Sequence, residues 1–331
     1  MLSPFKVVMI GAGSRANQVI YPAFDSLPDV EMAAICDIDL ERRDKTADQY
    51  GIAKRYGEGG VFDYQKMIRE IQPDAVVCVG QPHIMYDIWA WVLDQGLDLM
   101  IEKPFALTIH QAKSLLYRAE KNRCITQVSF QRRQTPMVKL LREKCLERGP
   151  VTHAVCRFYK CEATPFIGAR DHMMDDTVHS IDTLRWMCGG NDYVRVREMH
   201  SEVKRVGTPD INFISATLQF ENGSNGYLIN SWSSGKREFS VEMHAPGIYV
   251  NAEHETFGML YHDGDLTGER YDTREVAGSD AFFVYTGVQN VARDFVDGCR
   301  SRRQPLSSFG DALHTMEIAE KILAQATLEG C

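Results

Sequence analysis

The sequence has 331 residues and a net charge of −8, with 44% hydrophobic and 25% charged side chains. This length suits two domains, and the acidic balance argues against nucleic acid or an anionic membrane surface as the main partner. Nine scattered cysteines without a C-x-x-C pair favour buried free thiols and a cytoplasmic location over a zinc site. The chain opens on its first strand and has no apolar run of ~18 residues, so we expect neither a signal peptide nor a membrane span.

The first part of the chain alternates between apolar strands and helices. We expect strands at 6–10, 30–36, 75–79, 97–101 and 125–130, and helices at 15–26, 40–51, 63–71, 84–95 and 108–122. Alternation at these lengths indicates βαβ units with right-handed crossovers. The sequence therefore predicts a doubly wound parallel sheet of the α/β class.

After Gly149 and Pro150 the pattern changes to alternating strands. We expect them at 151–160, 194–203, 211–220, 225–233, 237–244 and 247–252, with Gly223 and Gly226 marking a hairpin turn. This pattern predicts a large, open, mainly antiparallel sheet in the C-terminal part. Amphipathic helices at 173–188 and 281–300 could cover one face, and an uncovered second face would suit self-association.

A glycine turn follows the first strand directly. The run from Gly11 to Ala16, with Gly11, Gly13, Ser14, Arg15 and Ala16 at its defining positions, fits the dinucleotide pattern G-x-G-x-x-G/A. Gly11 permits the tight turn, Gly13 lets the backbone approach a pyrophosphate, and Ala16 lets the helix pack on the strand. The helix N-terminus adds a partial positive charge for the phosphates. A purely structural strand-turn-helix is the alternative.

The second strand ends at Asp37, about 20 positions after Ala16, where a carboxylate accepts the ribose hydroxyls of NAD. The same carboxylate repels a 2′-phosphate, so we expect NAD as the cofactor. Arg42 and Arg43 follow shortly afterwards and could serve NADP instead.

Glu102, Lys103 and Pro104 stand at the carboxyl end of a predicted parallel strand. Ligands of open α/β sheets bind outside these strand ends, so Lys103 is expected to point toward the cofactor crevice. A cation there can stabilise a developing alkoxide or orient a substrate hydroxyl. A solvated lysine in a loop is the alternative.

Asp175, His179, Asp182 and Trp186 are spaced to share one stripe of a helix. Asp175 beside His179 can fix the tautomer of the imidazole and raise its basicity, which suits an acid/base near pH 7. The pair could also be half of a metal site. Taken alone, the segment fits best as a solvated face with an ion pair.

Taken together, these residues resemble the Gfo/Idh/MocA oxidoreductases, the glucose-fructose oxidoreductase and inositol dehydrogenase family. The resemblance covers nearly the whole chain: the glycine turn, Glu102-Lys103-Pro104, the segment 128–136, and Asp175-x-x-x-His179-x-x-Asp182. It implies an NAD-binding Rossmann domain at 1–125 and a substrate-binding and oligomerisation domain at 126–331, whose final helices could pack back on the first. A homodimer or homotetramer through the C-terminal sheet is also implied, as are roles for Glu102 and Lys103 in holding the cofactor.

The resemblance further implies that Lys103, Asp175 and His179 form a catalytic trio without a metal. The reaction would be reversible hydride transfer between a carbinol carbon of a sugar, polyol or sugar derivative and the nicotinamide. His179 would take the hydroxyl proton, Asp175 would orient His179, and Lys103 would bind the reacting oxygen. Members of the family differ over whether the lysine or the histidine is the principal base.

The substrate itself is less well defined by the sequence. Arg170, His172 and Asp176 are candidate contacts because they lie beside the Asp-x-x-x-His motif, and Trp232 could stack on a sugar ring or pack in the core. An anionic substrate could meet a set of basic residues that could equally be surface charge: Arg132, Arg133, Arg157 and Lys160.

Two other functions fit the same residues. One is glycoside cleavage with tightly bound NAD for transient oxidation, and the other is a non-catalytic regulator that senses a dinucleotide. The intact trio argues against the regulator.

Overall fold

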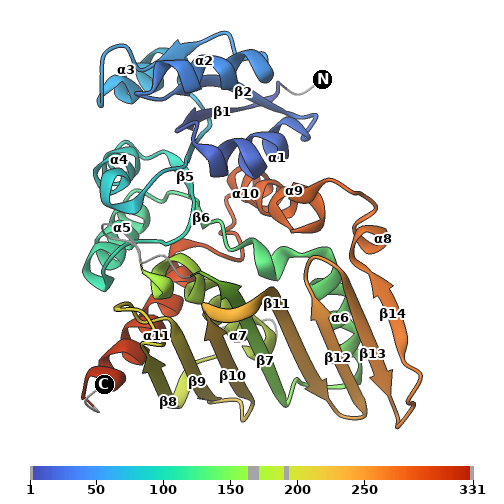
Figure 1. Ribbon diagram of the computed structural model, residues 1–331. Coiled ribbons are helices and arrows are strands. Elements are labelled where there is room, and N and C mark those ends of the chain that lie inside the picture. Colours follow the sequence, from blue (N-terminus) through green and yellow to red (C-terminus); the bar gives the residue numbers. More distant parts are fainter. Residues whose placement is uncertain (1–2, 163–170, 190–193, 329–331) are drawn as a thin grey trace. The chain divides into compact units, whose positions relative to one another are not determined.

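The computed structural model describes residues 3–162, 171–189 and 194–328 (Figure 1). The chain forms two compact units. The first comprises Met1–Ser129, Phe282–Val284 and Val288–Leu313, and the second comprises Phe130–Ala281, Tyr285–Gly287 and His314–Cys331. The first unit therefore continues beyond residue 125 and takes in a later part of the chain.

The first unit is built on a six-stranded sheet in the order β3-β2-β1-β4-β5-β6, and all neighbouring strands are parallel. The strands are β1 Phe5–Ile10, β2 Val30–Cys36, β3 Arg55–Tyr56, β4 Ala75–Cys78, β5 Asp98–Ile101 and β6 Thr126–Val128. This arrangement confirms the doubly wound parallel sheet. The strand order reverses between β1 and β4, which is where open sheets of this kind form a ligand crevice.

Helices follow the strands of this sheet. They are the π-helix η1 Ala16–Ile20 with α1 Tyr21–Asp25, then α2 Leu40–Gln49, α3 Asp63–Ile71, α4 Pro82–Asp94 and α5 Ile109–Lys121. Their starts have ordinary local causes. The Asp39 side chain caps α2 by accepting from the Arg42 N–H, the Thr108 hydroxyl caps α5, and a proline opens α4.

The helix expected at 281–300 is interrupted, and it does not cover the antiparallel sheet as predicted. Gly287, with φ +88°, separates α9 Phe282–Tyr285 from α10 Val288–Ser301. The apolar stripe of α10 is buried in the core of the first unit, near η1 and α1: Val288, Val291, Ala292, Phe295 and Val296. Helical spacing predicts that such a stripe is buried but does not identify its partner, so only the placement of this second helix on the sheet was wrong.

The second unit contains an eight-stranded sheet in the order β14-β13-β12-β11-β7-β10-β9-β8, antiparallel except between β7 and β10. This confirms the mainly antiparallel sheet, and Gly223, with φ +87°, lies in the expected β9–β10 turn. The strands are β7 His153–Cys161, β8 Val196–Lys204, β9 Phe213–Phe220, β10 Asn225–Ser231, β11 Ser233–Ala245, β12 Ile248–Glu253, β13 Phe257–His262 and β14 Glu269–Asp272.

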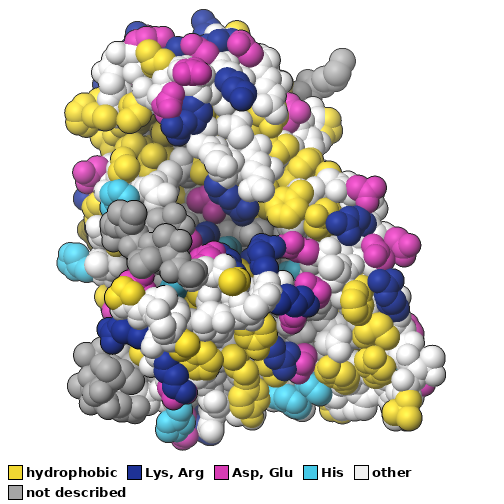
Figure 2. Space-filling model, viewed as in Figure 1, with side chains coloured by type: hydrophobic (Ala, Val, Ile, Leu, Met, Phe, Trp, Pro, Cys, Tyr) yellow, Lys and Arg dark blue, Asp and Glu magenta, His cyan; other side chains and the backbone are white. Residues whose placement is uncertain are grey.

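Helix α6 Pro136–Arg148 packs on β11 to β13 of this sheet, and α7 Val178–Gly189 packs on β7 and β10. Ser201 of β8 donates to the Ile322 carbonyl of a third helix, α11 Phe309–Leu328, at 3.1 Å. The other helical segments of the unit are η2 Gln131–Gln134, the π-helix η3 Met173–Thr177 and α8 Thr273–Ala277, and most of α11 also belongs to it. Along β7, buried and half-buried residues alternate, so one face of the strand is covered and the other is open. Figure 2, viewed toward the eight strands, shows hydrophobic side chains there among charged groups and histidines.

The eight described cysteines are free, and all except Cys161 are buried, as the sequence predicts for structural thiols. Among the described residues, no helix is long and apolar enough to span a membrane.

Candidate active site

The glycine turn after β1 combines one position where the fold requires glycine with one where it does not. Gly11 has φ +97°, and a Cβ there would lie 2.0 Å from the Val79 carbonyl oxygen. A Cβ on Gly13 would meet nothing closer than 3.9 Å, where the Arg42 side chain lies. The protein itself therefore leaves room at Gly13, and that room fits the close approach of a pyrophosphate.

Hydrogen bonds fix the turn from the helix that follows it. The Tyr21 hydroxyl donates to the Gly11 carbonyl at 3.2 Å, and the Asn17 amide donates to the Ala12 carbonyl at 2.7 Å. Ala16 is fully buried at the start of the π-helical turn, while Ser14 is exposed at the N-terminal end of the helical segment. Single π-helical turns are frequent at functional sites.

The Asp37 carboxylate connects the ends of β1 and β2. One oxygen accepts the Ala12 N–H at 2.6 Å, and the other accepts the Asp39 N–H at 2.8 Å. Each carboxylate oxygen can accept a second hydrogen bond, and Asp37 is only partly buried. Asp37 can therefore close the turn and still accept a ribose hydroxyl.

The two arginines after Asp37 have different surroundings. The Arg43 guanidinium is buried and pairs with Glu58 at 2.7 Å and Asp44 at 2.8 Å, so it is committed to the fold. Arg42 is half-exposed and pairs with Asp39 at 2.5 Å. The end of β2 thus carries two carboxylates, Asp37 and Asp39, but only the Arg42 guanidinium is accessible beside them, so negative charge is in excess there.

Glu102 and Lys103 follow β5 at the same edge of the sheet as the glycine turn, because carboxyl ends of parallel strands share one edge. Glu102 is buried and its carboxylate lies 3.4 Å from Arg15 Nε, which joins two predicted cofactor-binding residues. Lys103 is half-buried, and the Lys103–Pro104 peptide bond is cis. Lys103 therefore stands in the first unit at the edge where a dinucleotide would bind.

The Asp-x-x-x-His segment lies in the second unit on η3 and the start of α7. Asp171 starts this helix, since its side chain accepts the Met174 N–H at 2.7 Å and its carbonyl accepts the Asp175 N–H at 2.9 Å. Asp175 is half-buried and His179 is buried, and the His179 and Phe130 rings pack edge to face with their centres 5.8 Å apart. The segment is therefore not the solvated face that its sequence alone favours.

Polar contacts hold α7 in place on the sheet and on η2. Asn230 of β10 donates to the Thr177 hydroxyl at 3.1 Å and accepts from Ser180 at 3.2 Å. Asp182 and Arg133 form an ion pair at 2.8 Å, with side chains only 1% and 4% exposed. Asp182, the last residue of the motif, is thus a structural partner of Arg133.

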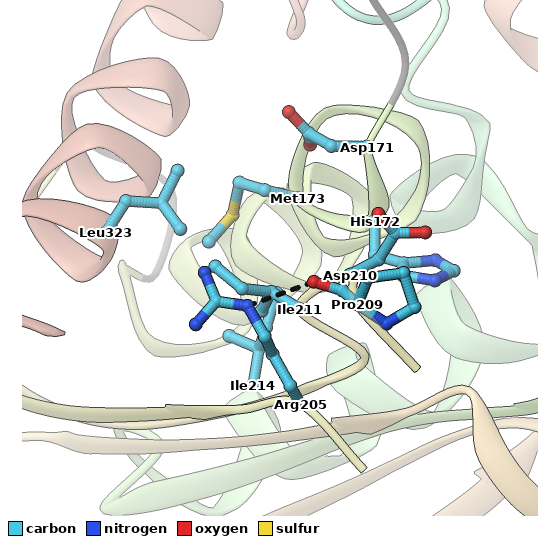
Figure 3. Close-up of a pocket in the computed structure, with 9 residues that line it drawn as sticks. All are labelled: Asp171, His172, Met173, Arg205, Pro209, Asp210, Ile211, Ile214 and Leu323. Atoms are coloured by element: carbon cyan, nitrogen blue, oxygen red, sulfur yellow. Dashed lines mark hydrogen bonds between the residues drawn. The ribbon is translucent and has the colours of Figure 1, made fainter. Parts of the chain in front are cut away.

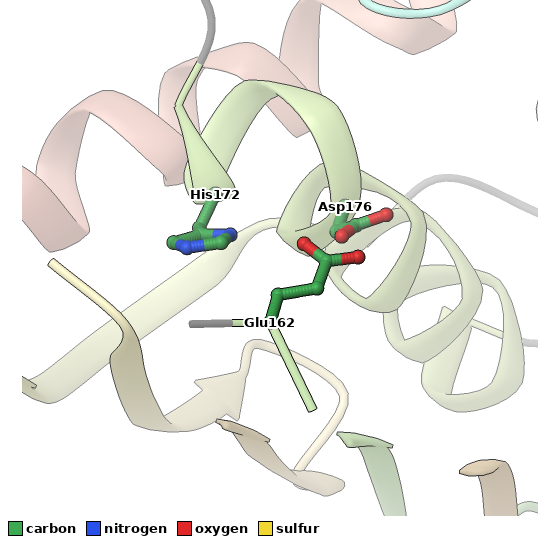
Figure 4. A group of neighbouring side chains, drawn as sticks. All are labelled: Glu162, His172 and Asp176. Atoms are coloured by element: carbon green, nitrogen blue, oxygen red, sulfur yellow. The ribbon is translucent and has the colours of Figure 1, made fainter. Parts of the chain in front are cut away.

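Asp176 is the centre of a buried polar cluster (Figure 4). Its carboxylate accepts the Trp232 indole N–H at 2.8 Å and lies 2.7 Å from Lys160 Nζ, which also lies 3.2 Å from Glu162. The His172 ring stacks on Trp232 at 4.2 Å, and burial lowers the pKa of His172 while Asp176 partly opposes this shift. Trp232 is fully buried with one ring face against His172, so it packs in the core.

Glu162, His172 and Asp176 have ligating atoms within 4.8 Å of one another, a spacing that could hold a metal ion. The Lys160 ammonium already lies within hydrogen-bond distance of both carboxylates. A divalent ion would have to displace this charge. The Lys160 ammonium therefore already supplies the positive charge that the two carboxylates require.

A cavity of about 230 Å³ opens beside this cluster in the second unit (Figure 3). Asp171 and His172 border it from one helix and Leu323 from α11, while Arg205 donates to the Pro209 carbonyl at 3.0 Å. Neither Asp175 nor His179 lines it, and it is smaller than the roughly 300–1,000 Å³ of typical ligand sites. The assignment of the trio therefore rests on the sequence motif and the helix that carries it.

The predicted site residues are distributed over both units. Asp175, Asp176, His172 and His179 share one helical segment, whereas Lys103 belongs to the first unit. Arg170 lies outside the described residues. The sequence interpretation did not include Glu162, although Lys160 and Glu162 at alternate positions at the end of β7 could have indicated a shared face.

Comparisons with known proteins agree with this fold. Residues 5–130 match the model of a family described as an oxidoreductase family with an NAD-binding Rossmann fold. D-glucoside 3-dehydrogenase of Escherichia coli is 24% identical over 72% of this chain and 73% of its own length. An inositol 2-dehydrogenase/D-chiro-inositol 3-dehydrogenase of Lactiplantibacillus plantarum is 24% identical over 58% of this chain and 54% of its own length. A dehydrogenase structure from Chromobacterium violaceum has a TM-score of 0.86 at 20% identity, covering 99% of this chain and 97% of that one.

The parallel sheet and its glycine turn give the first unit the architecture of a dinucleotide-binding Rossmann domain. Residues 5–130 match the model of the Gfo/Idh/MocA oxidoreductase family, which confirms the resemblance seen in the sequence over this part of the chain.

Proposed function

We propose that the protein is an NAD-dependent oxidoreductase that transfers a hydride between a carbinol carbon of a sugar, polyol or sugar derivative and the nicotinamide. The observation that carries this proposal is the match of residues 5–130 to an NAD-binding oxidoreductase family. Relatives named as glucoside and inositol dehydrogenases support the substrate class. When bound, NAD supplies the hydride acceptor.

In this proposal His179 is the acid/base residue, Asp175 orients it, and Lys103 binds the reacting oxygen. Support comes from the burial of His179 on a helix that Asn230 holds to the sheet, because a base needs a fixed position to reach its proton. Lys103 stands at the carboxyl end of β5, where its charge can stabilise a developing alkoxide. No metal is assigned a role.

We assign NAD as the cofactor in preference to NADP. Asp37 can accept ribose hydroxyls, and Asp37 and Asp39 together would repel a 2′-phosphate. Arg43 is committed to Asp44 and Glu58, and Arg42 is paired with Asp39. We expect an Asp37→Ser variant to lose much of its preference for NAD over NADP in titrations of both cofactors. An unchanged preference would contradict the role of Asp37.

The proposed function is tested by incubating the purified protein with NAD and a panel of cyclitols, aldoses, amino sugars, sugar acids and nucleotide sugars. Formation of NADH with at least one carbinol substrate is the expected result. The panel includes aryl glycosides, since release of the aryl group without net NADH would identify glycoside cleavage instead. Tight NAD binding without any turnover would indicate a regulator.

We further propose that the open face of the eight-stranded sheet joins copies of this chain into a homodimer or homotetramer. A row of half-buried aromatic rings crosses this face on β7, β11, β12 and β13. Its successive ring centres are 3.9, 4.7 and 5.7 Å apart: His153, His244, Tyr249 and Tyr261. Light scattering should give a multiple of 37.5 kDa for the wild type and a smaller mass for Tyr249→Glu. A monomeric wild type would contradict the assignment.

A cytoplasmic location is part of the same proposal. It is supported by the described cysteines, which are all free thiols, as expected in a reducing compartment.

A further inference from the structure

Arg132 differs from the other basic residues that surround the Asp-x-x-x-His segment. Among the described residues, its guanidinium makes no hydrogen bond and no ion pair, and its Nε is buried without a partner. The other three basic residues are paired: Arg133 with Asp182 at 2.8 Å, Arg157 with Glu242 at 2.6 Å, and Lys160 with Asp176 at 2.7 Å. Of these four cations, Arg132 is therefore the one that keeps hydrogen-bond donors open to a ligand.

Two aromatic rings hold this guanidinium. Arg132 Cζ lies 3.8 Å from the centre of the Phe239 ring and 4.7 Å from the centre of the Phe158 ring. These contacts stabilise the cation through the ring faces and leave its edge, where the N–H groups lie, unsatisfied. Nε is fully enclosed without a partner, while the side chain as a whole is half-buried. The donors are thus held in place before any ligand arrives.

The surroundings of Arg132 make this arrangement costly without an acceptor. Burial lowers the pKa of Arg132 to about 10, with Asp176 opposing the shift, so the group stays charged at neutral pH. A partly desolvated cation with unpaired donors loses hydration that a ligand oxygen can replace. A carboxylate matches the fork of a guanidinium with two parallel hydrogen bonds.

The charge of the neighbourhood selects among oxyanions. Asp176, whose charge acts on Arg132, shares the single ammonium of Lys160 with Glu162. Arg237 and Glu255 also act on Arg132, but they form an ion pair and offset one another, so the neighbourhood has an excess of negative charge. A phosphate with nearly two charges would be repelled more strongly than a carboxylate with one. The site therefore favours a monoanionic group.

Arg132 is also connected to the proposed base. It lies on η2, two residues after Phe130, whose ring contacts His179. Asp176, whose charge acts on Arg132, precedes His179 by three residues on the same helical segment. A ligand held by Arg132 would thus be held by the same wall of the second unit that presents His179.

We propose that Arg132 binds a carboxylate of the substrate and that the substrate class is a carboxylated sugar or polyol, such as a uronate or an aldonate. This assignment depends on the proposed function as a carbinol oxidoreductase and narrows its substrate. Arg132 sets the orientation of the substrate and does not take part in proton or hydride transfer.

The test compares NAD reduction with carboxylated and neutral partners: D-glucuronate against D-glucose, D-galacturonate against D-galactose, and D-gluconate against D-glucitol. We expect kcat/KM to be about 10- to 100-fold higher for at least one carboxylated member. Arg132→Met should abolish this preference by raising KM. Arg132→Lys, which keeps the charge and part of the ring contact, should retain a fraction of it. Arg148→Met on α6 is the matched control and should behave like the wild type.

Calorimetric titration of D-glucuronate, D-galacturonate and D-gluconate into the NAD-loaded protein separates failure of this inference from failure of the proposed function. If no compound is oxidised, the proposed function fails, while binding of a sugar acid that Arg132→Met loses still supports the carboxylate site. Oxidation of neutral sugars with no preference for acids, or equal affinity in Arg132→Met, would overturn the site and leave the proposed function standing. A preference for D-glucose 6-phosphate over every sugar acid would overturn the assignment of a carboxylate.

Discussion

The glycine turn of the first unit and the η3–α7 segment of the second unit are held in different ways. In the turn, backbone geometry and hydrogen bonds between side chains and backbone groups fix the conformation: Gly11 avoids the Val79 carbonyl, and the Asp37 carboxylate accepts the Ala12 N–H. In η3–α7, charged side chains are paired inside the unit, as in Asp182 with Arg133. The first site is therefore sensitive to added side-chain volume, whereas the second is sensitive to the loss of a charge.

The largest effect is expected from variants that remove the proposed chemistry from either region. Lys103→Ala and His179→Ala should each lower kcat by about 10²–10⁴ because they remove the group that binds or deprotonates the reacting hydroxyl. NAD affinity, measured by titration, should stay close to that of the wild type. His262→Ala, at an exposed position of β13, is the matched control. Full turnover in both trio variants would refute the assignment.

The next effect tests the charge sensitivity of the second unit. Asp182→Asn should lower the free energy of unfolding by about 3–5 kcal/mol, because it removes the charge of a carboxylate from a buried ion pair with Arg133. Denaturant titration measures this loss. The exposed pair of Arg148 and Asp263 provides the control, since Asp263→Asn should cost about 0–1 kcal/mol. Similar losses of unfolding free energy in Asp182→Asn and Asp263→Asn would contradict the greater importance of the buried pair.

The volume sensitivity of the first unit is tested by two neighbouring glycines. Gly11→Ala should lower the unfolding free energy by roughly 1–3 kcal/mol, because the new Cβ meets backbone at a positive φ. Gly13→Ala should leave stability within about 0.5 kcal/mol of the wild type and weaken NAD binding about tenfold. If Gly13→Ala bound NAD normally, the pyrophosphate would not pass close to this position.

A smaller effect is expected from pH in the second unit. His254 is buried with its ring edge-on to Phe239, and burial lowers its pKa from 6.5 to about 3. The unfolded chain therefore takes up the proton first as the pH falls. The stability contributed by neutral His254 is complete above about pH 6.5 and declines below it by up to ~1.4 kcal/mol per pH unit. Unfolding at about pH 7 and pH 5.5 should show this loss in the wild type and a smaller one in His254→Gln. A slope that His254→Gln does not reduce would contradict the prediction.

Much of the first unit was predictable because its signals are local. Apolar strand runs and helical patterns placed five of the six parallel strands and their helices, while the two-residue strand β3 was not predicted. The glycine turn and Asp37 lie within one βαβ unit. The π-helical turn at Ala16–Ile20 was not predicted, since no residue type marks it. The sequence also did not reveal that α10 packs in the first unit, because an apolar stripe does not identify its partner.

The second unit was less predictable, and the reason is distance along the chain. The motif Asp175-x-x-x-His179-x-x-Asp182 was recognised, but the partners of Asp176 and Asp182 come from η2, the end of β7 and the residue after β10. Their pairing depends on sheet register, which no single segment encodes. Elements with a weak pattern were also not predicted, among them α6, β13, β14 and α11.

Hydride transfer to NAD is tested most directly by placing a deuterium label on the carbinol carbon of an accepted substrate and following where it goes. With the wild-type protein and NAD, we predict that the label appears in NADH, with one deuterium transferred for each molecule of oxidised product. Product formed without label in NADH, or a label returned to the product without net NADH, would contradict a net hydride-transferring dehydrogenase.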